Sequence, residues 1–186
     1  MSKVCIFLAD GFEEIEGLTV VDLVRRAGIE IDTVSITGSE TIVGAHSIEL
    51  KADKLADTVD YSVYDMLVLP GGMPGTNHLK ASSLVRDALT KAYASGRYVA
   101  AICAAPTVLS DLGLLKGKKA CCYESMEGQL EADGAIVSRD EVVVTDKIIT
   151  SRGLGTAIPF ALSIIESLAD KALADKISDS IMYKLS

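Results

Sequence analysis

The sequence has little of what metal centres and disulfide scaffolds are built from. It contains only two histidines, His46 and His78, four cysteines and no Cys-x-x-Cys pair. Neither histidine stands near another ligand type at the spacing that metal sites use. The cysteines show no framework spacing, and the vicinal pair Cys121-Cys122 is a poor disulfide pair. We therefore expect no metal site, four free thiols and a cytoplasmic protein.

Long apolar runs and clusters of basic residues are also missing. The longest nearly uncharged apolar run, Val99 to Leu109, has about half the residues of a membrane span and contains Pro106. The run Val4 to Ala9 is too short for a signal peptide and lacks a cleavage site. The chain has 18 Lys and Arg against 26 Asp and Glu, and its densest basic stretch, Lys116 to Lys119, holds only three lysines. Because nucleic-acid binding needs clustered positive charge, we expect neither nucleic acid nor membrane as a partner.

The composition is that of a globular domain. The 186 residues are 49% hydrophobic and 24% charged, and apolar residues are spread along the whole chain, which excludes intrinsic disorder. No internal repeat, low-complexity tract or linker is visible. We predict one domain over residues 1–186, long enough to bury roughly 70% of the surface of the extended chain.

Apolar runs typical of buried strands alternate with stretches of helical period. Strands are predicted over residues 4–8, 31–36, 66–69 and 98–102, shorter strands over 119–122, 142–144 and 148–150, and a hairpin over 41–50. Helices are predicted over residues 14–27, 83–95, 156–168 and 171–183, and another directly after Cys103. This alternation predicts an α/β fold with a mostly parallel sheet covered on both faces. Ligands bind at the carboxyl ends of such strands, where Asp10-Gly11, Pro70-Gly71-Gly72 and Cys103 all fall.

Cys103 is the candidate nucleophile. It stands where a predicted strand turns sharply into a helix, so its sulfur is expected to project from the sheet at a helix N-terminus, which favours the thiolate. We expect this position to lower the thiol pKa well below 7. The alternative is that Cys103 is a small buried hydrophobic residue, as most free cysteines are.

Glu16 is the second candidate. Counting forward by helical spacing reaches Val20, Leu23, Val24 and Ala27, so this carboxylate heads a stripe that faces the core. Burial there would raise its pKa and leave it able to donate a proton near neutrality. The alternative is that Glu16 only complements the helix dipole.

Two glycine-rich segments complete the candidate site. Gly71 and Gly72 allow close approach of the backbone to a ligand and can present N–H groups to an oxyanion. Arg152 lies in a second glycine-rich loop, where it could hold an anion or pair with a surface acid. That loop lacks the Gly-Lys-Ser/Thr of a phosphate-binding P-loop.

Four segments together resemble the motifs of the ThiJ/PfpI superfamily, in the branch of the parkinsonism-associated protein deglycase. They are DGFEEIE at residues 10–16, VLPGG at 68–72, AAICAAP at 100–106 and TSRGLGT at 150–156. The resemblance covers essentially the whole chain. It implies a flavodoxin-like three-layer sandwich with a nucleophile elbow at Cys103, a homodimer and a site without a cofactor.

The resemblance also implies roles for single residues. Cys103 would be the nucleophile and the oxidation-sensitive thiol, and Glu16 its carboxylic-acid partner. Gly72 and Ala104 would supply backbone N–H groups, and Arg152 would line the entrance.

Some positions depart from the family pattern. Ala104 stands where peptidase-like relatives have a histidine, and no histidine follows His78, so neither a peptidase nor a glutamine amidotransferase is expected. Tyr123 stands where many relatives have a histidine. His46 stands where several have arginine, near the side of the site that faces the dimer partner.

Two functions of different class follow. The first is an enzyme acting on reactive dicarbonyls or glycation adducts, either a cofactor-independent glyoxalase or a protein deglycase, in which Cys103 adds to the carbonyl and Glu16 moves protons. The second is a redox-sensing or chaperone-like stress protein whose Cys103 is oxidised to a sulfinate. Both use the same residues, so the sequence cannot separate them; we favour the enzyme.

Overall fold

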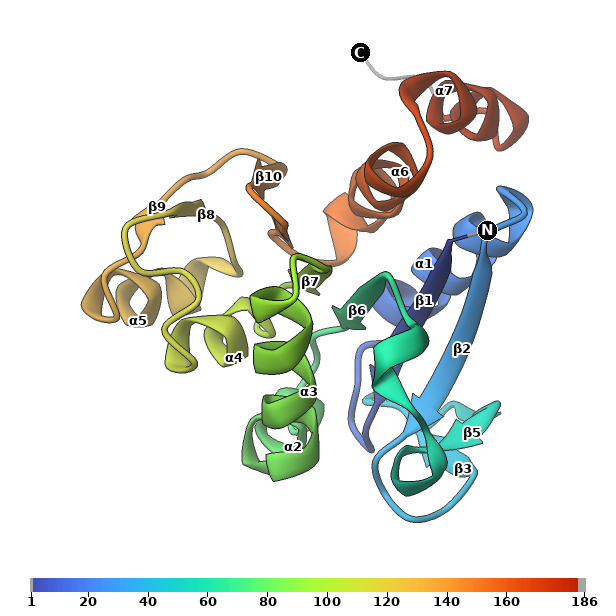
Figure 1. Ribbon diagram of the computed structural model, residues 1–186, viewed down its shortest axis with the longest axis horizontal. Helices are drawn as coiled ribbons and strands as arrows, with labels where there is room; N and C mark the ends of the chain where they lie inside the picture. The colour runs from blue at the N-terminus through green and yellow to red at the C-terminus, as the bar shows by residue number, and fades with distance from the viewer. Residues whose placement is uncertain (1, 184–186) are drawn as a thin grey trace.

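A seven-stranded sheet runs through the centre of the molecule (Figure 1). The computed structural model describes residues 2–183, so residue 1 and residues 184–186 of the predicted domain lie outside it. The strand order is β10 (Val142–Thr145), β11 (Ile148–Ser151), β7 (Tyr98–Ile102), β6 (Met66–Leu69), β1 (Lys3–Leu8), β2 (Glu30–Ser35) and β5 (Lys54–Leu55). Neighbouring strands are parallel, except that β10 and β11 are antiparallel. The predicted mostly parallel sheet is confirmed.

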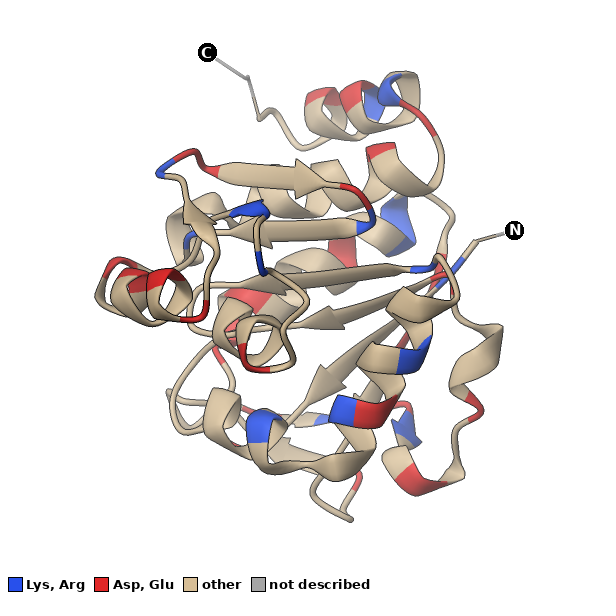
Figure 2. Ribbon diagram, turned by 60° about the vertical axis from the view of Figure 1, so that its left-hand side comes forward, with Lys and Arg blue, Asp and Glu red and all other residues tan. Residues whose placement is uncertain are grey.

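β1 shows why these strands form the centre of the fold. Val4, Ile6 and Leu8 join the core on one face of the sheet, and Cys5 and Phe7 join the core on the other. A strand buried on both faces needs an unbroken apolar sequence, and each large side chain removed from water contributes roughly 1.5–3 kcal/mol. In Figure 2 the strand ribbons are almost entirely free of charged residues.

Helices cover both faces, which makes the fold a flavodoxin-like three-layer sandwich (Figures 1 and 2). The core on the first face includes residues of α1 (Glu14–Arg26), α6 (Ala157–Leu168) and α7 (Lys171–Ser180). The core on the second face includes residues of α2 (Gly75–Ala81), α3 (Ser83–Ala94), α4 (Pro106–Asp111) and α5 (Glu127–Ala132). Within residues 2–183, none of these helices combines the length and the apolar character that crossing a bilayer requires.

Short elements complete the chain. Two pairs of strands lie outside the main sheet: β3 (Thr41–Val43) with β4 (Glu49–Lys51), and β8 (Lys119–Ala120) with β9 (Ile136–Val137). Single 3₁₀ turns are η1 (Ala56–Thr58), η2 (Tyr61–Val63), η3 (Glu124–Met126) and η4 (Leu154–Thr156).

The structure departs from the predicted elements at several places. β5 and β9 were not predicted, and the helix predicted over 171–183 ends at Ser180. α2 and α5 were not predicted, because each buries a single large apolar side chain, Leu79 or Leu130, and one such residue sets no helical period. The strand predicted over 119–122 ends at Ala120. The N–H of Cys121 donates instead to Thr150 Oγ1, so the segment leaves the ladder although it stays buried.

The strand order places the site. β1 is flanked by β2 on one side and β6 on the other, so the order reverses beside β1. Such a switch point opens a crevice at the carboxyl ends of the strands. The segments that follow β1, β6, β7 and β11 all start at that edge.

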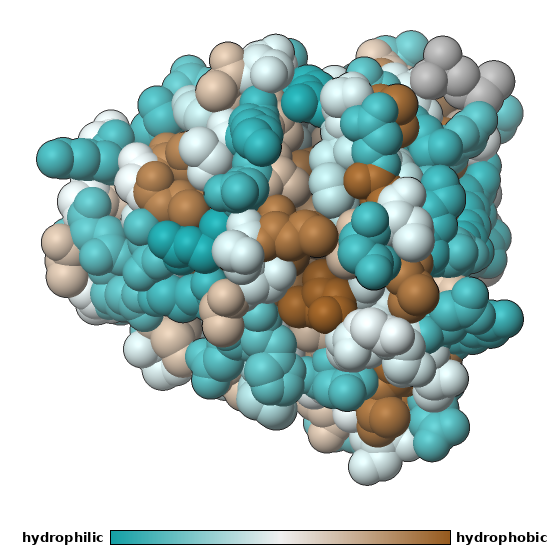
Figure 3. Space-filling model, turned by 60° about the horizontal axis from the view of Figure 1, so that its bottom comes forward, coloured by the Kyte–Doolittle hydropathy of each residue, from teal (hydrophilic) through white to brown (hydrophobic). Residues whose placement is uncertain are grey.

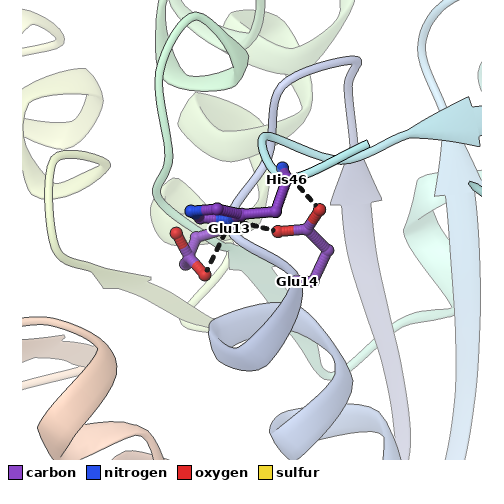
Figure 4. Close-up of side chains that lie close together, drawn as sticks. All are labelled: Glu13, Glu14 and His46. Atoms are coloured by element: carbon purple, nitrogen blue, oxygen red, sulfur yellow. Dashed lines mark hydrogen bonds and ion pairs between the residues drawn. The ribbon is translucent and has the colours of Figure 1, made fainter. Parts of the chain in front are cut away.

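Glu14 and His46 tie the β3–β4 hairpin to the start of α1 (Figure 4). One oxygen of the buried Glu14 carboxylate accepts the His46 N–H at 2.8 Å, and the other lies 2.9 Å from His46 Nδ1. Burial opposes ionisation of Glu14, but the hydrogen bonds from His46, together with those from the backbone of Glu14 and Ile48, outweigh it and lower the Glu14 pKa. The hydrogen bond to Glu14, with the charges of Glu13 and Glu14, raises the His46 pKa.

Replacing His46 with Gln should therefore lower stability in a pH-dependent way. A histidine whose pKa is raised on folding stabilises the native state fully below its unfolded pKa, near 6.5. That contribution is lost as the pH rises through the raised native pKa. The difference in melting temperature between wild type and His46→Gln should thus be largest near pH 6 and shrink toward pH 9.

His78→Gln is the control for this experiment. The His78 ring lies 3.0 Å from the backbone oxygen of Asp10 and forms no ion pair among the described residues. A difference for His46→Gln that stays constant from pH 6 to 9 would contradict the ion pair with Glu14.

Candidate functional site

Cys103 lies at a sharp turn between β7 and α4. Its φ of 66° is in the left-handed region, which is uncommon for a residue with a side chain and is found at strained functional positions. Two backbone hydrogen bonds hold the turn: the Cys103 N–H donates to Ser151 O at 3.0 Å, and the Tyr123 N–H donates to Cys103 O at 2.7 Å. The side chain is half-buried, so the turn forms the elbow expected from the sequence.

Glu16, in the first turn of α1, meets Cys103 from the neighbouring segment. The residue is 1% exposed, and Val20, Leu23 and Val24 behind it are buried in the predicted stripe. Glu16 Oε2 accepts the Gly71 N–H at 2.9 Å, and the carboxyl group lies beside the Cys103 thiol, since Glu16 Oε1 and Cys103 Sγ are 3.9 Å and 4.0 Å from the position of a Cβ added to Gly153. A buried carboxyl group and a half-buried thiol therefore share one small space.

Gly71 closes one side of that space. A Cβ on Gly71 would lie 2.6 Å from Cys103 Cβ and 2.6 Å from Glu16 Oε2. Only a residue without a side chain fits there.

The backbone N–H groups of Gly72 and Ala104 lie near the Cys103 thiol and favour its ionised form. Gly72 has a φ of +89°, which favours glycine, and an added Cβ would overlap the Glu13 backbone. Both N–H groups act to lower the Cys103 pKa. Cys103, Glu16, Gly72 and Ala104 thus lie close together in the structure.

The pKa of the Cys103 thiol differs from the value expected from the sequence. Burial raises the pKa of Glu16 to about 7, against hydrogen bonds from Cys103 and Gly71. Burial, followed by the charge of Glu16, raises the pKa of Cys103 to about 12 and outweighs the two N–H groups. The expected depression of the thiol pKa by the helix N-terminus alone is therefore wrong. The two groups titrate as a coupled pair, so the first proton lost near neutrality belongs to the pair and not to one residue alone.

The other thiols are less accessible. Cys5, Cys121 and Cys122 are fully buried, and none of the four cysteines is in a disulfide. Burial raises the pKa of Cys121 to about 11 and that of Cys122 to about 12. Cys103 is the one cysteine with exposed surface.

The remaining predicted residues lie around this centre with different contacts. Arg152 directs Nη2 toward Glu127 Oε1 at 3.7 Å, so the structure favours pairing with an acid over holding an anion. Tyr123 is about half exposed, and its backbone N–H donates to the carbonyl oxygen of Cys103. His46 is held by Glu14 at the start of α1, beside Glu13, whose N–H donates to Gly71 O.

Gly153 also borders the site, although the sequence did not single it out. An added Cβ would lie 4.0 Å from Cys103 Sγ and 3.9 Å from Glu16 Oε1. The signal in the sequence was the glycine-rich loop itself. Only Arg152 in that loop has a charged side chain, so it was the residue considered.

Among the described residues, one group of three potential metal ligands comes together: Glu13, Glu14 and His46, with ligand atoms within 4.8 Å of one another (Figure 4). Spacing along the sequence did not indicate this group, because His46 and Glu14 are 32 residues apart along the chain. Both Glu14 oxygens already accept hydrogen bonds from His46, so the group acts as the clamp described above.

Comparison with known proteins agrees with this geometry. Residues 2–167 match the model of the DJ-1/PfpI family. Protein dj-1beta of Drosophila melanogaster is 39% identical over 183 residues, which cover 98% of each chain. The glutathione-independent glyoxalase DJR-1.2 of Caenorhabditis elegans is 31% identical over 156 residues, 84% of this chain and 82% of the relative.

Among solved structures, the oxidised DJ-1 of Toxoplasma gondii superimposes with a TM-score of 0.95 at 38% identity and covers 100% of both chains. The likeness thus extends over sequence, fold and length. The chain belongs to the DJ-1/PfpI family.

Proposed function

We propose that this protein is a cofactor-independent cysteine enzyme that acts on reactive dicarbonyls. The observation that supports this most strongly is that Cys103 and the buried Glu16 carboxyl group lie side by side between Gly71 and Gly153, next to the backbone of Gly72 and Ala104. A nucleophile, a proton carrier with a pKa of about 7 and donors for an oxyanion are the groups that such a reaction requires. The relative named as a glutathione-independent glyoxalase adds support.

The first step joins the thiol to the substrate. Cys103 sulfur attacks the aldehyde carbon of a 2-oxoaldehyde such as methylglyoxal, an S–C bond forms and the C=O double bond becomes a single bond. The N–H groups of Gly72 and Ala104 hold the oxygen as negative charge develops on it. The proton shared by Cys103 and Glu16 goes to that oxygen, giving a hemithioacetal.

The second step moves a proton between adjacent carbons. Glu16, now a carboxylate, takes the C–H proton from the former aldehyde carbon, and an enediolate forms. Returning the proton to the neighbouring carbon gives the lactate thioester of Cys103. Water then breaks the S–C bond, releasing lactate and restoring the thiol, so the balance is methylglyoxal plus water to lactate.

The same residues suit early glycation adducts on Cys, Arg and Lys side chains. Such an adduct carries its carbonyl-derived carbon on a protein nitrogen or sulfur. Cys103 sulfur would bond to that carbon as the C–N or C–S bond to the glycated side chain breaks, and the released side chain would take the proton held by Cys103 and Glu16. In this proposal, one site carries out both the glyoxalase and the deglycase reaction, on two kinds of substrate.

A redox-sensing or chaperone-like role is the second candidate. Glu16 with a pKa of about 7 can remain protonated and donate a hydrogen bond to a Cys103 sulfinate. The T. gondii relative was solved in an oxidised form. This role requires no turnover, which separates it from the first.

We also propose a homodimer that acts in the cytoplasm without nucleic acid or membrane. Four free thiols suit a reducing compartment. Ile15 and Leu18 on α1 are 50% and 39% exposed, and Figure 3 shows further groups of hydrophobic side chains at the surface. A partner packed on α1 near the His46 segment would cover such residues.

Cys103→Ala should abolish formation of lactate from methylglyoxal without glutathione, because no other thiol lies against Glu16. The measurement is lactate release by purified protein. Cys5→Ala, in the interior of β1, is the control and should keep activity. Lactate at the wild-type rate from Cys103→Ala would overturn the mechanism, and absence of turnover in wild type would favour the redox role.

Glu16→Gln should lower turnover by ~10²-fold or more, the usual scale for a lost general acid–base. Gln can still accept the Gly71 N–H and donate to the sulfur, but it cannot relay a proton. Alkylation of Cys103 by iodoacetamide, followed by peptide mapping, should therefore persist. If turnover stays within a few-fold of wild type, Glu16 is not the proton carrier.

Sedimentation at micromolar concentration should give twice the 19.6 kDa chain mass. Leu18→Asp should shift the protein toward monomer, because a charge would be buried in the α1 interface. Val63→Asp is the control, since Val63 is 55% exposed in η2, which packs with the opposite core. A monomer in wild type would refute the dimer.

A further inference from the structure

The Cys103–Glu16 pair lies between two glycines that differ in the space they leave. On the Gly71 side, an added Cβ would lie 2.6 Å from atoms of both residues, so that side is closed. On the Gly153 side, an added Cβ would lie 4.0 Å from Cys103 Sγ, 3.9 Å from Glu16 Oε1 and 3.5 Å from Tyr123 Cδ2. Those are ordinary van der Waals distances, so the pair has room for about one methyl group there.

Glycine is not required at position 153 by the backbone. Its φ of 163° is extended and open to any residue. Its conformation is held by Thr156, which accepts the Gly153 N–H through Oγ1 at 3.1 Å and donates its own N–H to Gly153 O at 2.8 Å. Gly153 therefore contributes open space, because it has no side chain and the loop holds its backbone in place.

We propose that Gly153 sets the size of the group that a substrate can carry beside the carbon attacked by Cys103. The proposal rests on the proposed attack of Cys103 on a carbonyl carbon. With the Gly71 side closed, the substituent of a 2-oxoaldehyde lies against the Gly153 backbone and the Tyr123 ring. The substrate class is therefore 2-oxoaldehydes with a carbon substituent, such as methylglyoxal, as well as glyoxal.

Gly153→Ala tests this directly, because the added methyl fits without overlap and occupies the space in question. We expect kcat/KM for glyoxal to stay within about 2-fold, and that for methylglyoxal to fall by at least ~10-fold, the scale of one methyl group in a pocket. The kcat/KM for phenylglyoxal should fall further than that for methylglyoxal. An equal loss for all three substrates, or no loss for any, would overturn the proposal.

Gly155→Ala is the matched control in the same loop. An added Cβ at Gly155 meets no atom within 4 Å, and its backbone is outside the left-handed region. This variant should keep the wild-type ratio of methylglyoxal to glyoxal turnover. A changed ratio in Gly155→Ala would show that the loop as a whole, and not Gly153, selects the substrate.

Alkylation of Cys103 separates failure of this proposal from failure of the proposed function. Rates are measured in native protein with iodoacetamide and with the bulkier N-phenylmaleimide. Gly153→Ala should slow the maleimide by at least ~10-fold more than iodoacetamide. This ratio can be read even if wild type converts no dicarbonyl, and an unchanged ratio overturns the role of Gly153.

Discussion

The hydrogen bond from the Gly71 N–H to the buried carboxyl group of Glu16 is the contact on which the site depends. It joins the turn after β6 to the first turn of α1. A second hydrogen bond, from the Glu13 N–H to Gly71 O, connects the same two segments. The two segments can approach this closely only because Gly71 has no side chain. With α1 fixed in this way, Glu16 lies beside Cys103, next to the backbone of Gly72.

Burial of the Glu16 carboxyl group costs free energy, and the same burial sets the pKa on which the proposed chemistry depends. An ionised carboxylate that has lost water is destabilised, which raises the Glu16 pKa to about 7, and a thiolate beside it is destabilised further. The pair therefore keeps one proton where two exposed groups of these types would behave independently. A proton held between a nucleophile and a base near neutral pH is available for transfer in either direction.

The sheet provides the rigid frame for these contacts. β1, β6, β7 and β11 end at one edge because they are parallel, and both of their faces are packed by helices. Cys103 can hold its unfavourable φ because the Ser151 and Tyr123 backbones bond to it from both sides. Strain at the elbow is thus compensated by hydrogen bonds to segments far away in the sequence.

The sequence by itself determined the fold class and the members of the central pair. Unbroken apolar runs predict doubly buried strands, and the helical spacing behind Glu16 predicts a carboxylate that faces the core, because both are local periodic patterns. The tertiary structure decided the contacts between segments. It set the raised pKa values of Cys103 and Glu16, the hydrogen bonds between Glu14 and His46, and the open space at Gly153. These depend on distances between residues far apart along the chain, which only the packing of the strands and helices fixes.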